Sequence, residues 1–298
     1  MPTLNLPYLK NGLLMKADRG VRMNSHLAAN TTKYVVLILV AIIMFFPMIW
    51  IMSSSLKTLT GISTYPPQII PSHPQWNNFI QVLTTGHVLT YFRNTLILII
   101  ANTIGTLMSS SLVAFPLARM QFSGHKIMFG LILATMMVPN VATIIPQFIL
   151  FSKFGWLNTL LPLVVPGFFA YPYNVFLFRQ FYKGVPKNLD EAAMIDGCNK
   201  WQVFVRILVP LSKPVFITVG VLSAVFWWNE LFTPLIFINN SSLMPLTVGA
   251  LSAFTTQYTQ MYNLQMAFSV FMIIPPMFLY LFAQKYLVAG IKTTGGKG

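Results

Sequence analysis

Residues 186–210 read Pro-Lys-Asn-Leu-Asp-Glu-Ala-Ala-Met-Ile-Asp-Gly-Cys-Asn-Lys-Trp-Gln-Val-Phe-Val-Arg-Ile-Leu-Val-Pro, and they lie between two long apolar runs. The segment is the only long, helix-forming stretch that carries charge in a chain built mainly of residues suited to lipid. A polar helix held against the face of a membrane bundle is well placed to receive a push from a soluble partner. The segment therefore predicts a docking site on a membrane protein.

The first half of this segment predicts a short helix. Pro186 ends the preceding helix, and Asn188 with Glu191 three residues later fits a capping box. Asp190 and Glu191 would lie at the positive end of the helix dipole, which stabilises acidic side chains. Gly197 fits a C-terminal stop in the left-handed conformation.

The second half predicts another helix with one apolar face. Trp201, Phe204, Val205 and Leu208 fall at the spacing i, i+3, i+4 and i+7. Pro210 would end this helix, because proline lacks a backbone N–H. The two helices predict a compact knob with an acidic end, which either docks on a protein partner or rests on lipid headgroups.

The composition is that of an integral membrane protein. The 298 residues are 55% hydrophobic and 8% charged, whereas soluble domains carry roughly a quarter charged residues. The net charge of +14 does not indicate a nucleic-acid site, because the basic residues lie between apolar segments on alternate connections. The single cysteine, Cys198, excludes an intramolecular disulfide and a cysteine-based metal site.

Six apolar runs are long enough to cross a bilayer, which needs roughly 20 residues per helix. The sequence therefore predicts an all-α integral membrane protein with six transmembrane helices. The runs are Tyr34–Met52, Leu96–Leu117, Ile127–Phe151, Leu157–Phe178, Pro214–Phe232 and Gln265–Ala283.

The distribution of lysine and arginine predicts the orientation. Of the 19 such residues, only Lys57, Arg93 and Lys153 lie on one side of the six runs. The positive-inside rule places the other side, with both termini, in the cytoplasm. The expected parts are a cytoplasmic arm (1–33), a first helix with an outer loop (34–90), a five-helix core (91–287) that includes the loop 179–213, and a cytoplasmic tail (288–298).

Polar side chains inside the runs are candidates for a substrate path, because amides, hydroxyls and aromatic faces bind sugars. Each could instead form interhelical hydrogen bonds, and tryptophans could form an interfacial belt. The candidates are Asn94, Asn102, Asn140, Tyr173, Asn174, Trp228, Asn229 and Glu230.

The knob resembles a known signature. Glu191-Ala192-Ala193, then Gly197 after three residues, then Ile207 and Pro210, is similar to the coupling signature of ATP-binding-cassette importer permeases; Val209 stands where that signature usually has leucine. Over residues 91–298 the chain resembles carbohydrate permeases of the maltose-transporter type, in particular their six-span partner subunit. Tyr91-Phe92-Arg93-Asn94-Thr95, Ala118-Arg119-Met120-Gln121-Phe122 and the ending from Gln284 to Ile291 carry this resemblance.

The resemblance implies a type I importer permease fold with a cytoplasmic coupling helix, in a bacterial cytoplasmic (inner) membrane. The partners it implies are a second homologous permease, an ATPase dimer that binds residues 186–201 and the tail, and an extracytoplasmic sugar-binding protein that meets loops 57–92 and 235–263. The ATPase-coupling residues would be Asp190, Glu191, Ala192, Ala193, Met194, Asp196 and Gly197.

The residues themselves indicate no enzyme. The tail Gly295-Gly296-Lys297-Gly298 lacks the Ser/Thr and the following helix of a phosphate-binding loop, so ATP and Mg would be bound by partner ATPase subunits. Two alternatives stay open. One is an importer for another solute, such as a polyol phosphate or an amino acid. The other is a self-sufficient carrier or channel, which should show intramembrane carboxylates or inverted repeats.

Overall fold

A computed structural model describes residues 7–85, 87–255 and 259–295, and side chains from 30 to 284 within those ranges. The described chain is all-helical and contains no β-strand. The helices are α1 (Pro7–Ser55), α2 (Leu59–Ile62), α3 (Asn77–Thr85), α4 (Val88–Arg119), α5 (His125–Thr135), α6 (Asn140–Lys153), α7 (Leu161–Val164), η1 (Val165–Phe168), α8 (Pro172–Gly184), α9 (Asn188–Ile195), α10 (Lys200–Val203), η2 (Phe204–Leu208), α11 (Val209–Leu211), α12 (Lys213–Asn229), α13 (Phe232–Phe237), η3 (Ser241–Leu243), α14 (Leu246–Ser252) and α15 (Tyr262–Gly295).

Four segments of the described chain are long and apolar enough to cross a membrane unaided. They are Asn30–Ser55, Val88–Arg119, Leu161–Gly184 and Tyr262–Gln284. Two further candidates are bent pairs of helices, α5 with α6 at 93° and Lys200–Leu211 with α12 at 75°. The count is therefore four, or up to six when each bent pair is one span.

The third predicted run, Ile127–Phe151, is not one helix. The chain leaves the helix after Thr135 and re-enters it at Asn140, directly after Pro139. Proline disfavours helical geometry in the residue before it and has no N–H to donate, so the break falls where the sequence places this proline.

The fourth and fifth runs have shifted boundaries. The fourth begins at Leu161 and continues to Gly184, beyond the predicted end at Phe178, so Arg179 lies inside α8. The fifth helix, α12, ends at Asn229 instead of Phe232, and a separate helix α13 follows.

Helix α4 lies at the centre of the bundle and packs against α8, α12 and η1. At one end its core includes Tyr91, Trp228 and Phe268, and at the other it packs with Phe178 and Phe204. The core therefore runs along α4 from end to end.

The outer helices have mostly exposed apolar surfaces, as expected for a lipid-facing layer. Helix α1 packs against α15, and its apolar side chains between residues 34 and 46, including Ile43 and Met44, are exposed. The structure of residues 1–33, which the sequence left open, continues α1 back to Pro7, and residues 1–6 lie outside the described part.

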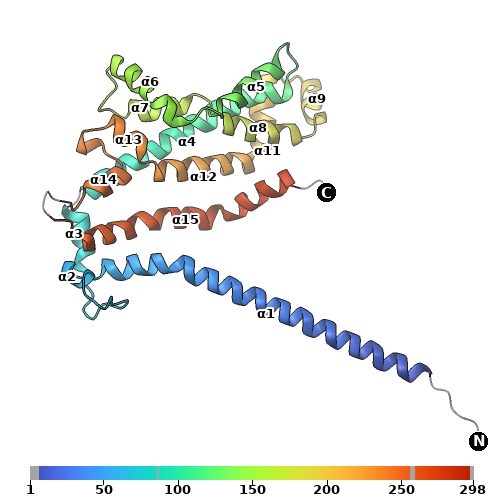
Figure 1. Cartoon of the computed structure of the whole chain (residues 1–298). Coiled ribbons are helices and arrows are strands. Elements are labelled where there is room, and N and C mark those ends of the chain that lie inside the picture. Colours follow the sequence, from blue (N-terminus) through green and yellow to red (C-terminus); the bar gives the residue numbers. More distant parts are fainter. Residues whose placement is uncertain (1–6, 86, 256–258, 296–298) are drawn as a thin grey trace, which may run out of the picture.

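The two ends of the bundle differ in what they carry. Figure 1 shows α2 and α3 at one end and α9 at the other, and the first turn of α1 and the last turn of α15 extend toward the α9 end. At the α2 end the loop is ordered by Asn78, whose side-chain amide donates to the carbonyls of Ser55 (2.8 Å) and Lys57 (2.9 Å).

Candidate functional site

The first helix of the knob, α9, begins at the predicted cap residue, so its N-cap lies one residue earlier. Lys187 is the N-cap residue and has helical dihedral angles, and Asn188 is the first helical residue with no capping side-chain bond. The predicted capping box of Asn188 and Glu191 is therefore wrong. The box is found in the next helix instead, where Asn199 accepts from the Gln202 N–H (2.9 Å) and the Gln202 side chain accepts from the Asn199 N–H (2.8 Å).

The end of α9 confirms the predicted role of Gly197. Its φ is +85°, the left-handed region that glycine adopts without strain. The Gly197 N–H donates to the Met194 carbonyl (3.1 Å), and the Cys198 N–H donates to the Ala193 carbonyl (2.9 Å). This is the Schellman pattern, and it turns the chain sharply into the second helix.

The predicted apolar stripe of the second helix is only partly right. Phe204 and Leu208 are buried, but Trp201 and Val205 are exposed and Val203 is buried instead. Residues 204–208 form a π-helical turn, which changes the residue spacing that the stripe assumed. Pro210 does not end the helix, because it lies at the start of α11, and the chain bends after Leu211.

The two faces of α9 have different surroundings. The exposed residues of α9 include Asn188, Glu191, Ala192 and Ile195, and Ile195 is 86% exposed. Their spacing puts them on one face, called here the docking face. Asp196 and Gly197, at its end, are also exposed.

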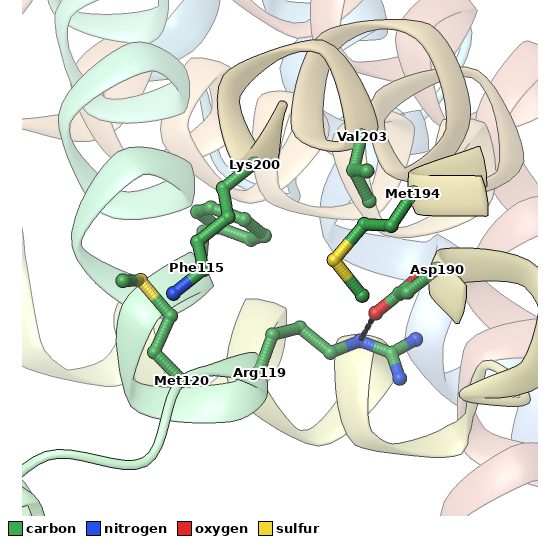
Figure 2. Close-up of a pocket in the computed structure, with 7 residues that line it drawn as sticks. All are labelled: Phe115, Arg119, Met120, Asp190, Met194, Lys200 and Val203. Carbon is green, nitrogen blue, oxygen red and sulfur yellow. Dashed lines mark ion pairs between the residues drawn. The ribbon is translucent and has the colours of Figure 1, made fainter. Parts of the chain in front are cut away.

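The opposite face points into the bundle. Ala193 is buried and Asp190 is partly buried. Met194 is 47% exposed and also lines a cavity of ≈ 60 Å³, together with Phe115, Arg119, Met120, Asp190, Lys200 and Val203. Figure 2 shows these side chains converging from α4, α9 and α10. The seven predicted coupling residues thus divide between an outward and an inward face.

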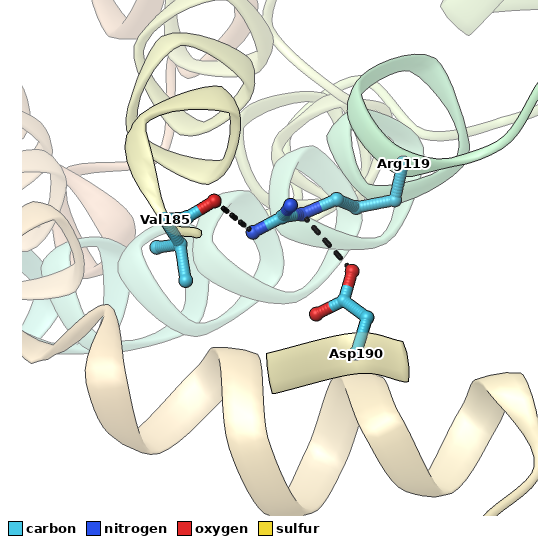
Figure 3. A network of polar contacts seen from close by, with 3 residues as sticks. All are labelled: Arg119, Val185 and Asp190. Carbon is cyan, nitrogen blue, oxygen red and sulfur yellow. Dashed lines mark hydrogen bonds and ion pairs between the residues drawn. The ribbon is translucent and has the colours of Figure 1, made fainter. Parts of the chain in front are cut away.

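Arg119 connects this inward face to α4. Its Nε lies 3.4 Å from Asp190 Oδ2, and its side chain is 4% exposed. Its Nη2 also donates to the Val185 carbonyl (2.9 Å), as Figure 3 shows. Burial raises the pKa of the Asp190 carboxyl above its ordinary value, and the opposing attraction of Arg119 does not cancel that effect.

A second arginine lies beside the first. Arg179 Nε donates to the Leu117 carbonyl (3.1 Å), in the last turn of α4. Its guanidinium carbon lies 3.7 Å from the centre of the Phe129 ring. In the sequence analysis Arg119 and Arg179 served only as basic residues of the connections. Neither the ion pair of Arg119 with Asp190 nor the bond of Arg179 to Leu117 was predicted. The chain has five acidic residues and 19 basic ones. A partly buried Asp190 could therefore have been expected to pair with a basic side chain.

Three of the predicted substrate-path residues are buried and bonded to backbone. The Asn94 side chain donates to Ser242 O (2.8 Å) and Met244 O (3.0 Å), Asn102 donates to Leu98 O (2.9 Å), and the Trp228 ring N–H donates to Met272 O (3.1 Å). These bonds position helices and loops. A contact of these three residues with substrate stays a prediction.

The other five predicted residues lie at or near helix ends. Asn140, Tyr173 and Asn229 are exposed, and Asn174 and Glu230 are partly buried. Glu230 follows α12, and its carboxylate accepts from the Thr233 N–H (2.8 Å) at the start of α13.

The arrangement is suited to docking and to transmitting motion. Within the described residues, no three His, Cys, Asp or Glu side chains are placed to hold a metal ion. The chemistry that the site offers is an exposed helix face with acidic and apolar groups, anchored from behind by an ion pair.

Comparison with known proteins gives a consistent picture. Residues 101–293 match the protein family described as "Binding-protein-dependent transport system inner membrane component". The arabinooligosaccharides transport system permease protein AraQ of Halalkalibacterium halodurans is 32% identical over 262 residues, covering 87% of this chain and 93% of that protein. The melibiose/raffinose/stachyose import permease protein MelC of Bacillus subtilis is 30% identical over 277 residues, covering 91% of this chain and 99% of that protein.

A solved structure shares the fold. A chain in the crystal structure of a bacterial ABC transporter involved in the import of the acidic polysaccharide alginate superposes with a TM-score of 0.78. The likeness covers 96% of this chain and 99% of that one at 22% sequence identity. The helical arrangement described above is therefore shared with a chain of that transporter.

Proposed function

This chain belongs to the family of binding-protein-dependent transport system inner membrane components, and from that premise we propose that it is a non-catalytic permease subunit of a carbohydrate importer. It forms part of the translocation path for a sugar, an oligosaccharide in our proposal, that an extracytoplasmic binding protein delivers. ATP and Mg are bound by separate ATPase subunits, and this chain binds no cofactor.

The docking face of α9 is the observation that carries the proposal. It presents an acidic residue, Glu191, beside the small Ala192 and the protruding Ile195. A side chain that is 86% exposed and apolar at the end of a helix is costly in water and favourable in the groove of a partner. The face also lies at the bundle end toward which α1 and α15 extend (Figure 1), which supports the proposal that both termini are cytoplasmic.

The sugar assignment rests on the relatives and on the type of side chain available. AraQ and MelC are named for the transport of oligosaccharides. Tyr173 and Asn229 offer an exposed aromatic ring and an exposed amide near helix ends, and Asn174 follows Tyr173 in the chain. Aromatic faces and amides suit the C–H and hydroxyl groups of a sugar.

A second permease is part of the proposal, and the central helix α4 offers an apolar surface against which it can pack. Ile100, Ile104 and Met108 are exposed although α4 is the central helix of this chain. A homologous subunit placed against this surface would enclose a path between the two. The binding protein would meet the opposite end, at residues 57–92 and 235–263.

Co-purification followed by reconstitution tests the proposal. The chain, expressed in its native host with an affinity tag, should bring down an ATPase and a second membrane protein of the same family. In liposomes the complex should take up an oligosaccharide only with ATP and a binding protein, and this chain alone should be inert. Uptake by the chain alone, driven by an ion gradient, would establish a secondary transporter instead.

The class of solute needs its own measurement. A thermal-shift screen of the binding protein that co-purifies with the complex should give stabilisation by neutral oligosaccharides. Stabilisation only by polyol phosphates or by amino acids would keep the permease assignment and replace the sugar.

A further inference from the structure

We propose that Arg119 transmits motion from the docking face to the transmembrane bundle, as a positioning residue that acts through Asp190. The inference rests on the proposed function, since it supposes that an ATPase moves α9. It adds the specific link by which that movement reaches α4.

Helix α9 is connected to the bundle through few elements. Its backbone packs most closely on α10, the next helix of the knob. The chain between α8 and α9 is a short turn at residues 185–187, and Pro186 in that turn is exposed. Pro186 fixes one φ of this turn, but the other dihedral angles of residues 185–187 can change and absorb a displacement. A push on α9 therefore needs a firmer connection to reach the spans.

Arg119 supplies that connection from the last residue of α4. One guanidinium holds two elements at once, because Nε faces Asp190 in the first turn of α9 and Nη2 bonds the Val185 carbonyl after α8. The side chain is 4% exposed, so water screens the ion pair little. The Val185 contact is a directional hydrogen bond, whereas the contact of Nε with Asp190 is an ion pair without hydrogen-bond geometry. Arginine can make both contacts with one planar group, which a lysine cannot do.

The helix that Arg119 ends is the one best placed to distribute the motion. Helix α4 contacts α8, α12 and η1 along its length, and Arg179 fastens α8 to its last turn through the Leu117 carbonyl. The two cations also lie at the negative end of the α4 dipole, where positive charge is favoured. A movement of Asp190 would therefore displace the end of α4, the helix in the middle of the bundle.

The cavity beside the ion pair gives the link room to move. Its ≈ 60 Å³ lie between α4, α9 and α10, and Met194 and Met120 line it with flexible side chains. Figure 2 shows Arg119 and Asp190 meeting at its edge. A tightly packed contact at this place would resist a rotation of α9. The cavity lets α9 rotate while Arg119 and Asp190 stay paired.

The test uses the complex purified with its own ATPase and a reporter on α4. Leu89, exposed at the far end of α4, is replaced by cysteine in a Cys198→Ser background. Its labelling rate with a membrane-impermeant maleimide is measured without nucleotide and with ATP plus vanadate. In the parent the two rates should differ. In Arg119→Met that difference should shrink about tenfold, within the range of coupling between two sites, while the ATPase still co-purifies and hydrolyses ATP.

Three further variants separate transmission from a merely structural role. Arg119→Lys keeps the charge and should restore part of the difference. Arg119→Met combined with Asp190→Asn should be no worse than Arg119→Met alone, because both remove the same link. Arg206→Met, at an exposed position of η2, should match the parent. If Arg119→Met does not retain the ATPase, Asp190→Asn alone provides the same comparison.

The outcomes distinguish this inference from the proposed function. A parent complex that contains no ATPase contradicts the proposed function. A complex that contains it, yet shows the parental labelling difference in Arg119→Met or no difference in the parent, overturns the role of Arg119 and leaves the proposed function standing.

Discussion

The backbone N–H of Cys198 donates to the carbonyl of Ala193 over 2.9 Å, and this bond closes the helix that carries the docking face. It forms only because Gly197, between them in the turn, adopts a φ of +85°. The direction in which the chain leaves α9 is therefore set by one glycine. Its neighbourhood is open, with no atom within 4 Å of the place where a Cβ would stand.

Gly197→Ala should thus weaken the turn by conformational strain alone. A non-glycine residue in the left-handed region costs about 1–2 kcal/mol, and no steric clash adds to it. We expect normal membrane insertion, faster hydrogen exchange in α9 and reduced transport. The matched control is Gly184→Ala at the end of α8, where the space is equally open and the backbone needs no positive φ. Equal exchange in both variants would contradict the strain argument.

Glu191→Lys should reduce retention of the ATPase without destabilising the fold. Glu191 is exposed on the docking face, and exposed substitutions usually change stability by less than about 0.5 kcal/mol. A tenfold loss of binding corresponds to about 1.4 kcal/mol, and we expect at least that in a pull-down titration. Lys126→Glu, an exposed charge reversal at the start of α5, serves as the control. Wild-type uptake by Glu191→Lys would refute the docking role.

Gly167→Ala should destabilise the bundle strongly. A Cβ at this position would overlap the side-chain amide of Asn102, and it would also stand 3.2 Å from the Asn102 Cα. The amide cannot turn away freely, because Asn102 is fully buried and donates to Leu98 O. Overpacking of this kind costs about 1–3 kcal/mol. Thermal unfolding in detergent should show a lower midpoint than in Gly130→Ala, where the added carbon meets nothing within 4 Å; equal midpoints would argue against the close crossing.

The stability of the knob should depend on pH through Asp190. Burial raises the pKa of this carboxyl above 3.8, so the folded state binds the proton more tightly than the unfolded chain. The contribution is therefore fully favourable below pH 3.8 and is lost as the pH rises through the folded pKa. Asp190→Asn should flatten this dependence in thermal unfolding curves recorded between about pH 4 and pH 7. An unchanged slope in the variant would show that other groups cause it.

Much of this architecture could be predicted because lipid imposes simple requirements. The first, second and last spans follow from apolar length, which a bilayer core fixes at roughly 20 residues. Gly197 was predictable because few residues tolerate its backbone conformation. In each case a single local property of the chain determines the structure.

The predictions from the sequence are wrong where tertiary contacts determine the local structure. Asn188 matches the composition of a cap, but Lys187 already has helical angles, so the chain enters the helix earlier. The π-helical turn before Pro210 cannot be read from hydrophobic spacing. The pairing of Arg119 with Asp190 joins residues 71 positions apart, and only the fold brings them to 3.4 Å.

The division of the coupling residues into two faces was also beyond the sequence. Asp190 and Glu191 are adjacent acidic residues in one helical turn, and composition treats them alike. The structure turns Asp190 toward Arg119 and leaves Glu191 exposed. Their substitutions should therefore have different effects, on transmission for Asp190 and on docking for Glu191.

Crosslinking from Cys198 tests most directly whether the knob is gripped by an ATPase. The chain has no other cysteine, and this one lies directly after the glycine turn of α9. In native membranes, a cysteine-directed photocrosslinker on Cys198 should give a product that contains the ATPase, and its yield should change on addition of ATP. Labelling of Cys198 in intact cells by a membrane-impermeant maleimide, or crosslinks to lipid alone, would contradict the account.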